Sequence, residues 1–181
     1  MFCCCGCSTC PTANIKLFTP GKEANEATSF IFLRKELPVR LANIMSELHL
    51  LPNKLLRMPS VELVQSWYER SFQEILTFEK GDADSPKALE NFCDTLVKIR
   101  NRHSSVVETM AQGIIELKQT HNLDQQTEHC IQYFLNRFYM SRISIRMLIN
   151  QHAALFGSDL AANNPRHIGV IDPNVCTFLS V

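Results

Sequence analysis

The sequence lacks the features that mark several large classes of protein. No apolar run comes near the roughly 20 residues that a membrane-spanning helix needs. The 18 basic residues balance 18 acidic ones, so the general positive charge of nucleic-acid-binding proteins is missing. Only six glycines are present, and neither a Gly-x-x-x-x-Gly-Lys nor a Gly-x-Gly-x-x-Gly phosphate loop occurs. What remains, at 45% hydrophobic and 20% charged residues, is the composition of one globular domain.

Cysteine is crowded into one place. Five of the eight cysteines fall within the first ten residues: Cys3, Cys4, Cys5, Cys7 and Cys10. A secreted disulfide scaffold would spread its pairs along the chain, and a structural zinc site would need a second ligand pair. We interpret residues 1–21 as an atypical, reduced and disordered tail, with acylation and metal binding as alternatives. No secretory signal is visible, and because the first basic residue is Lys16, neither is an Arg-rich transit peptide.

Apolar residues recur every three or four positions through most of the chain, which is the spacing of amphipathic helices. The pattern predicts four helices, over residues 24–49, 60–80, 85–120 and 124–156. Ser60 and Ser85 are suited to cap two of the N-termini, Pro38 should kink the first helix or start a new turn, and Gly157 should end the last. We therefore predict an all-α fold. An antiparallel four-helix bundle would occupy residues 22–157, and an extended linker residues 158–181.

Charged side chains interrupt the apolar faces of the last two helices. His103 occupies a core-facing position of the third helix, one turn after Arg100. On the fourth helix Arg142 lies on the apolar stripe and Arg146 follows four residues later. Unpaired buried guanidinium groups are costly, so these need partners. One interpretation is a small-anion pocket in which His103 has a charge tunable near neutral pH. The other is a structural ion-pair network with Glu36, Glu69, Glu108 or Asp94.

Several longer segments resemble signatures of the mitochondrial pyruvate dehydrogenase kinases, in the right order from about residue 24 to residue 181. They are FLRKELPVRLANI at 32–44, SWY at 66–68, IRNRH at 99–103, TMAQG at 109–113, YMSRISIRML at 139–148, HIG at 167–169 and IDP at 171–173. The kinase of the branched-chain ketoacid complex is similar, but the IRNRH and IDP forms favour the pyruvate type.

The resemblance implies a two-domain organisation and an activity for the full-length kinase. Members of this family join a helical regulatory domain to an ATP-binding domain of the GHKL type, and they phosphorylate serines of pyruvate dehydrogenase to inactivate the complex. The second domain would begin after Val181, so this chain is expected to be the regulatory part alone. We then expect no catalytic residue, no metal and no cofactor in this chain, with ATP and Mg²⁺ required only by the full-length kinase. The alternative is a stand-alone module that binds a small carboxylate or a lipoyl-domain partner without catalysis.

The resemblance also implies sites, partners and a location. The family pocket for pyruvate-like carboxylates maps onto Leu41, Tyr68, Ser71, Ile99, Arg100, His103, Ser141, Arg142, Ile145, Arg146 and Ile149. Phe32 matches a contact with the lipoyl domain of the transacetylase, although part of that surface belongs to the second domain. The family dimerises through that second domain, which implies a monomer here. The family is found in the mitochondrial matrix, and neither nucleic acid nor a membrane span is expected.

Overall fold

The computed structural model describes residues 25–81, 83, 85–121, 124–157 and 169–170, and within them it contains helices and no strand. The six helices are α1 (Glu26–His49), α2 (Asn53–Leu56), α3 (Pro59–Leu76), α4 (Pro86–Arg102), α5 (Val106–Thr120) and α6 (Gln125–Phe156). The all-α prediction is confirmed. The predicted tail at 1–21 and all of the predicted linker except residues 169–170 lie outside the described residues.

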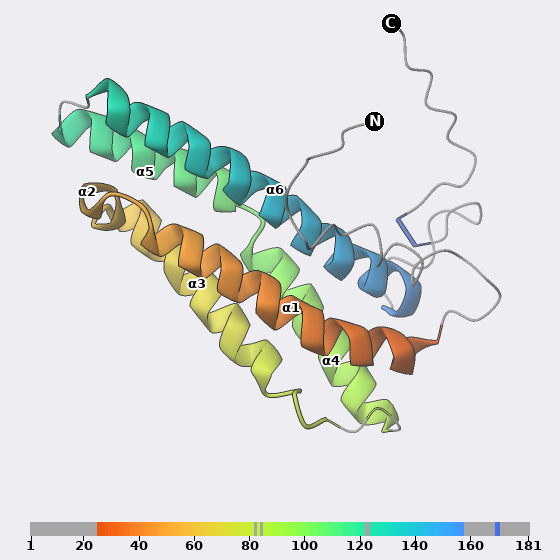
Figure 1. The fold of residues 1–181 in the computed structure, drawn as a ribbon. Coiled ribbons are helices and arrows are strands. Elements are labelled where there is room, and N and C mark those ends of the chain that lie inside the picture. Colours follow the sequence, from red (N-terminus) through yellow and green to blue (C-terminus); the bar gives the residue numbers. More distant parts are fainter. Residues whose placement is uncertain (1–24, 82, 84, 122–123, 158–168, 171–181) are drawn as a thin grey trace, which may run out of the picture.

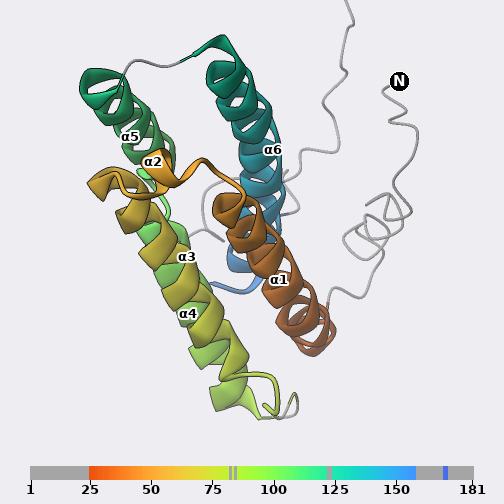
Figure 2. The same cartoon turned by 60° about the vertical axis from the view of Figure 1, so that its left-hand side comes forward.

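The long helices run alongside one another, and α5 follows α4 along the chain after a short break (Figure 1). Helix α1 packs against both α3 and α6, α3 packs against α5, and α4 packs against α6. The view in Figure 2 shows α5 and α6 diverging toward the loop that joins them. The site described below lies between α3, α4 and α6, near the middle of the molecule.

The prediction of one continuous third helix was wrong. Helix α4 ends with His103 as its C-cap, and α5 begins after Ser105. The carbonyl groups freed at this break accept hydrogen bonds from Arg142 of α6, at 2.8 Å for His103 O and 3.4 Å for Ser104 O. A charged donor satisfies carbonyls that an uninterrupted helix would have paired internally. The break is thus held by a side chain from a distant part of the sequence.

The predicted helix ends were mostly correct. Ser85 and Asp124 are N-caps, Asp124 accepts a hydrogen bond from the Thr127 backbone N–H, and Gly157 is the C-cap of α6. Helix α1 continues through Pro38 as a single helix. Ser60 is not a cap: α3 begins one residue earlier, after Met58, with proline in its first turn.

The apolar faces meet in one continuous core. Its largest fully buried side chains include Tyr68, Phe30, Phe92 and Phe138, and the Phe30 and Phe92 rings meet edge to face with centroids 4.8 Å apart. No described helix is long and apolar enough to cross a bilayer. Within the same residues, no three His, Cys, Asp or Glu side chains gather as a metal site would require.

Candidate functional site

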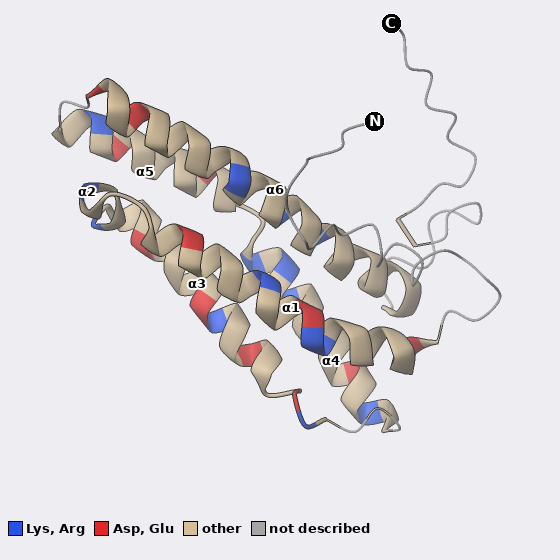
Figure 3. Cartoon of the chain, in the orientation of Figure 1, with Lys and Arg blue, Asp and Glu red and all other residues tan. Residues whose placement is uncertain are grey.

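A small cavity lies between α3, α4 and α6. It is lined by Tyr68, Arg100, His103, Arg142, Ile145, Arg146 and Ile149. Its volume is about 10 Å³, which is room for roughly one water molecule. Figure 3 shows basic residues at the C-terminal end of α4, near the middle of the molecule. Three guanidinium groups therefore converge on a space that is closed in this conformation.

The polar atoms of the lining are incompletely satisfied. The Nη2 of Arg142 is used by the carbonyls at the end of α4, but its buried Nε has no hydrogen-bond partner among the described residues. The hydroxyl of Tyr68, a residue only 1% exposed, has none either. Leaving such a group buried and unpaired costs about 1–3 kcal/mol. Two unpaired donors in one cavity are suited to an anion that accepts hydrogen bonds from both.

No described carboxylate neutralises the cations of the lining. Arg100, Arg142 and Arg146 form no ion pair with an acidic side chain in the part of the chain that the structure describes. The predicted structural network would have used the acidic residues Glu36, Glu69, Glu108 and Asp94. Instead, Glu36 pairs with Arg40 and Glu69 accepts a hydrogen bond from Gln65. The observed pairings therefore leave the lining with a net positive charge.

His103 is neutral at physiological pH, contrary to the prediction of a charge tunable near pH 7. Its pKa is lowered from 6.5 to about 4, mainly by burial and also by the cations Arg102 and Arg142, while a hydrogen bond to the Trp67 carbonyl and the charge of Glu74 oppose the shift. Burial likewise raises the pKa of Tyr68 above its usual range, so its hydroxyl keeps the proton. His103 and Tyr68 thus contribute hydrogen-bonding capacity rather than charge.

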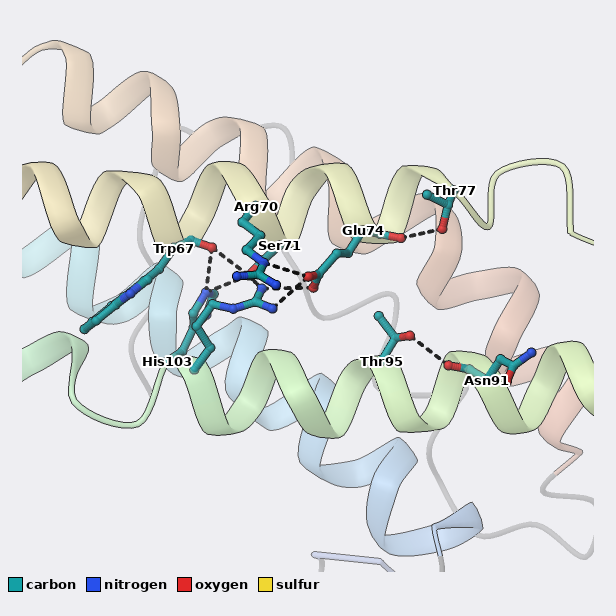
Figure 4. A network of polar contacts seen from close by, with 9 residues as sticks. Trp67, Arg70, Ser71, Glu74, Thr77, Asn91, Thr95 and His103 are labelled. Atoms are coloured by element: carbon teal, nitrogen blue, oxygen red, sulfur yellow. Dashed lines mark hydrogen bonds and ion pairs between the residues drawn. The ribbon is translucent and has the colours of Figure 1, made fainter.

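A second layer of polar residues supports the lining (Figure 4). The guanidinium of Arg102 binds Glu74 through two bonds, Nη2–Oε1 at 2.7 Å and Nη1–Oε2 at 2.9 Å. The same Nη1 donates to Ser71 Oγ at 2.9 Å, and Ser71 Oγ lies 3.0 Å from His103 Nε2. Sequence reasoning missed Arg102 and Glu74. The only signal for Arg102 was its position next to His103, and periodicity assigns no partner to such a neighbour.

The structure separates the eleven predicted pocket residues into two groups. Seven line the cavity, and four do not: Leu41, Ser71, Ile99 and Ser141. Leu41 and Ile99 are fully buried in the core, and Ser71 contacts His103 from behind. The lipoyl candidate Phe32 is half-buried and packs against the core away from this cavity.

Comparisons with known proteins agree with the motifs. A family model described as mitochondrial branched-chain alpha-ketoacid dehydrogenase kinase matches residues 14–172. Human [pyruvate dehydrogenase (acetyl-transferring)] kinase isozyme 1 is 58% identical over 160 residues, which is 87% of this chain and 36% of the relative. Human isozyme 3 is 58% identical over 150 residues, 83% of this chain and 37% of the relative. Mouse isozyme 4 is 53% identical over 175 residues, 96% of this chain and 42% of the relative.

The chain thus spans less than half the length of these curated relatives, which are named as mitochondrial kinases. The family model covers most of the chain, and the matched region includes every helix described above. The chain therefore belongs to the mitochondrial dehydrogenase kinase family, and its match lies with the pyruvate dehydrogenase kinases, as its motifs predicted.

Proposed function

We propose that this chain is the helical regulatory part of a pyruvate dehydrogenase kinase, a protein-serine kinase that inactivates the pyruvate dehydrogenase complex in the mitochondrial matrix. The family membership and the identity of 52–58% to named isozymes support this proposal. ATP and Mg²⁺ would be bound by the part of the relatives that this chain does not match. The matched region alone would therefore bind neither ATP nor Mg²⁺. It would also be a monomer, because the family dimerises through the other domain.

Within this regulatory part, the cavity between α3, α4 and α6 binds a small carboxylate of the pyruvate type. The observation that carries this proposal is the pairing of two unsatisfied buried groups, Arg142 Nε and Tyr68 OH, in a lining that no described carboxylate neutralises. A carboxylate offers oxygens to both groups and matches the geometry of a guanidinium. Because the cavity has room for only about one water molecule, the ligand must displace a wall. Arg100 and Arg146 are the half-buried arginines of this wall that make no contact with the carbonyls at the end of α4, so we assign the displacement to them.

The single tryptophan provides the experiment. Trp67 lies on α3 next to Tyr68, and its carbonyl is 3.4 Å from His103 Nε2. We expect dichloroacetate, a stable pyruvate-like carboxylate, to change its fluorescence saturably. The response should weaken by tenfold or more in Arg142→Met, because losing a charge-assisted hydrogen bond costs about 1.5–3 kcal/mol.

The matched control is Arg137→Met. Arg137 lies on the same helix but is exposed and pairs with Glu47, so its loss should leave dichloroacetate binding unchanged. ATP should produce no response in any of the three proteins. If dichloroacetate gives no response in a wild-type chain that melts cooperatively, the arginines are structural and the pocket is refuted. If ATP binds, this chain carries nucleotide-binding machinery and is more than a regulatory part.

Phe32 extends the proposal to a partner. We assign Phe32 to the contact with the lipoyl domain of the transacetylase because of the motif in which it lies. Its ring is half-buried against the core, so part of it is accessible to a partner. This surface and the anion pocket are separate sites on the same bundle.

A further inference from the structure

The C-terminal part of α6 holds a short stretch of the chain that follows it. Gln151 is a polar residue of α6 that is only 3% exposed, and its Oε1 accepts a hydrogen bond from the backbone N–H of Val170 at 2.9 Å. The two residues are 19 positions apart along the chain. A buried amide of this kind needs hydrogen-bond partners. One partner of Gln151 is therefore backbone from beyond the end of α6.

The residue beside this hydrogen bond, Gly169, has to be glycine for two separate reasons. Its φ is +64°, in the left-handed region that residues with a Cβ rarely adopt. In addition, a Cβ at this position would lie 2.6 Å from Oε1, 2.7 Å from Nε2 and 2.8 Å from Cδ of Gln151. The backbone of Gly169 thus packs closely against the amide group of Gln151, and a larger residue would push the two apart.

The turn of α6 that carries Gln151 is itself fixed to two other helices. The next residue, His152, is fully buried, and its Nδ1 lies 2.7 Å from the Oγ of Ser29 in the first turn of α1. The His152 ring also meets the ring of Phe92 on α4 edge to face, with centroids 5.6 Å apart. The backbone at Val170 is thereby connected, through one turn of α6, to both α1 and α4.

We propose that Gln151 and Gly169 form a clasp that fixes the chain to α6 at Val170, so that the backbone there is placed relative to the bundle. The sequence alone had predicted an extended linker over residues 158–181. The side chain of Val170 is 44% exposed, so the clasp holds the backbone and leaves the side chain at the surface. The clasp is independent of the anion pocket. Its use in regulation rests on the proposed function: a shift of α6 would be passed to the chain at this point.

The backbone dynamics of Val170 in the ¹⁵N-labelled chain test the clasp. In the wild type we expect an N–H order parameter of about 0.85, the value of a rigid backbone. It should fall below about 0.6 in Gln151→Met, which keeps the size of the side chain but removes the acceptor, and in Gly169→Ala. In both variants the Val170 amide hydrogen should exchange with solvent about fivefold or more faster, because its hydrogen bond is lost.

Two matched controls separate loss of the clasp from a general effect of substitution. Gln132→Met makes the same change at an exposed glutamine of α6, and Val170→Ala shortens an exposed side chain while keeping its N–H. Both should leave the dynamics of the residue 170 amide as in the wild type. If Gln151→Met does not fold, Gln151→Asn takes its place, because it keeps the amide group but shortens its reach by one methylene. Gly169→Ala changes no residue of a helix, so the helices should remain in that variant.

Two results would overturn the clasp. One is a wild-type Val170 with an order parameter below about 0.6, and the other is a value near 0.85 that persists in both Gln151→Met and Gly169→Ala. These measurements need no ligand. If dichloroacetate fails to bind, the proposed anion pocket is refuted while the clasp is still decided by the dynamics of Val170, so the two proposals fail separately.

Discussion

Helices α3 and α5 cross closely at Gly113, and the substitution Gly113→Ala should lower the stability of the fold. A Cβ added at Gly113 would lie 2.5 Å from Val61 Cγ2, 3.4 Å from Val61 N and 3.6 Å from Ser60 Cβ. Val61 is fully buried, and its β-branched side chain has one strongly preferred rotamer in a helix, so it cannot turn away. Overpacking of this kind costs about 1–3 kcal/mol, against a gain of about 1 kcal/mol when alanine replaces glycine in a helix.

The balance predicts a net loss of about 1 kcal/mol in the free energy of unfolding, or about 2–4 °C in Tm for a domain of this size. Urea and thermal unfolding followed by circular dichroism would measure it. Val61→Ala serves as the partner in a double-mutant cycle, because it removes the Cγ2 that alanine at 113 would strike. The cost of Gly113→Ala should shrink or reverse in that background. A Gly113→Ala chain that is more stable than the wild type would refute the argument, since it would mean that the helices have room for the methyl group.

Two further predictions concern the polar core. Tyr68→Phe should weaken dichloroacetate binding about fivefold or more, because it removes one of the two unpaired buried groups. The control Tyr133→Phe changes an exposed residue and should leave binding unchanged. If Tyr68→Phe binds dichloroacetate as tightly as the wild type, Tyr68 is not part of the site. Burial lowers the pKa of His152, like that of His103, to about 4, while both titrate near 6.5 in the unfolded chain. As the pH falls from about 6.5 to 4, the unfolded chain binds protons that the folded chain does not, so the free energy of unfolding should fall by up to about 3 kcal/mol per histidine. Chemical denaturation across that pH range should show that the free energy of unfolding falls less steeply with pH in His152→Gln than in the wild type. If it falls equally steeply in both, the lowered pKa of His152 is contradicted.

The sequence predicted helices far better than it predicted where one of them breaks. Helix positions follow from apolar spacing, and that spacing continues across the α4–α5 break because His103, Val106 and Met110 are all buried. Neither glycine nor proline marks the break. It is held by Arg142, which is 39 residues away from His103 along the chain, and no local pattern can report such a partner.

The candidate site shows the same limit at the level of single residues. Periodicity placed His103 and Arg142 on core faces, and the structure brings both to one cavity. Periodicity could not supply the protonation state of His103, which depends on burial and on groups from other helices such as the Trp67 carbonyl and Arg142. Nor could it identify Arg102, because adjacent residues on a helix point in different directions and are not expected to share a site.

Arg142 connects the fold and the proposed function. Its Nη2 is committed to the carbonyls at the end of α4, and the buried donor left over is Nε. A carboxylate bound through Nε and the Tyr68 hydroxyl would leave the hydrogen bonds at the α4–α5 break intact. A carboxylate that took Nη2 would have to compete with those carbonyls and would expose the end of a helix. The first arrangement costs fewer existing hydrogen bonds, so we expect an anion in the proposed pocket to bind through Nε and to leave the α4–α5 junction intact.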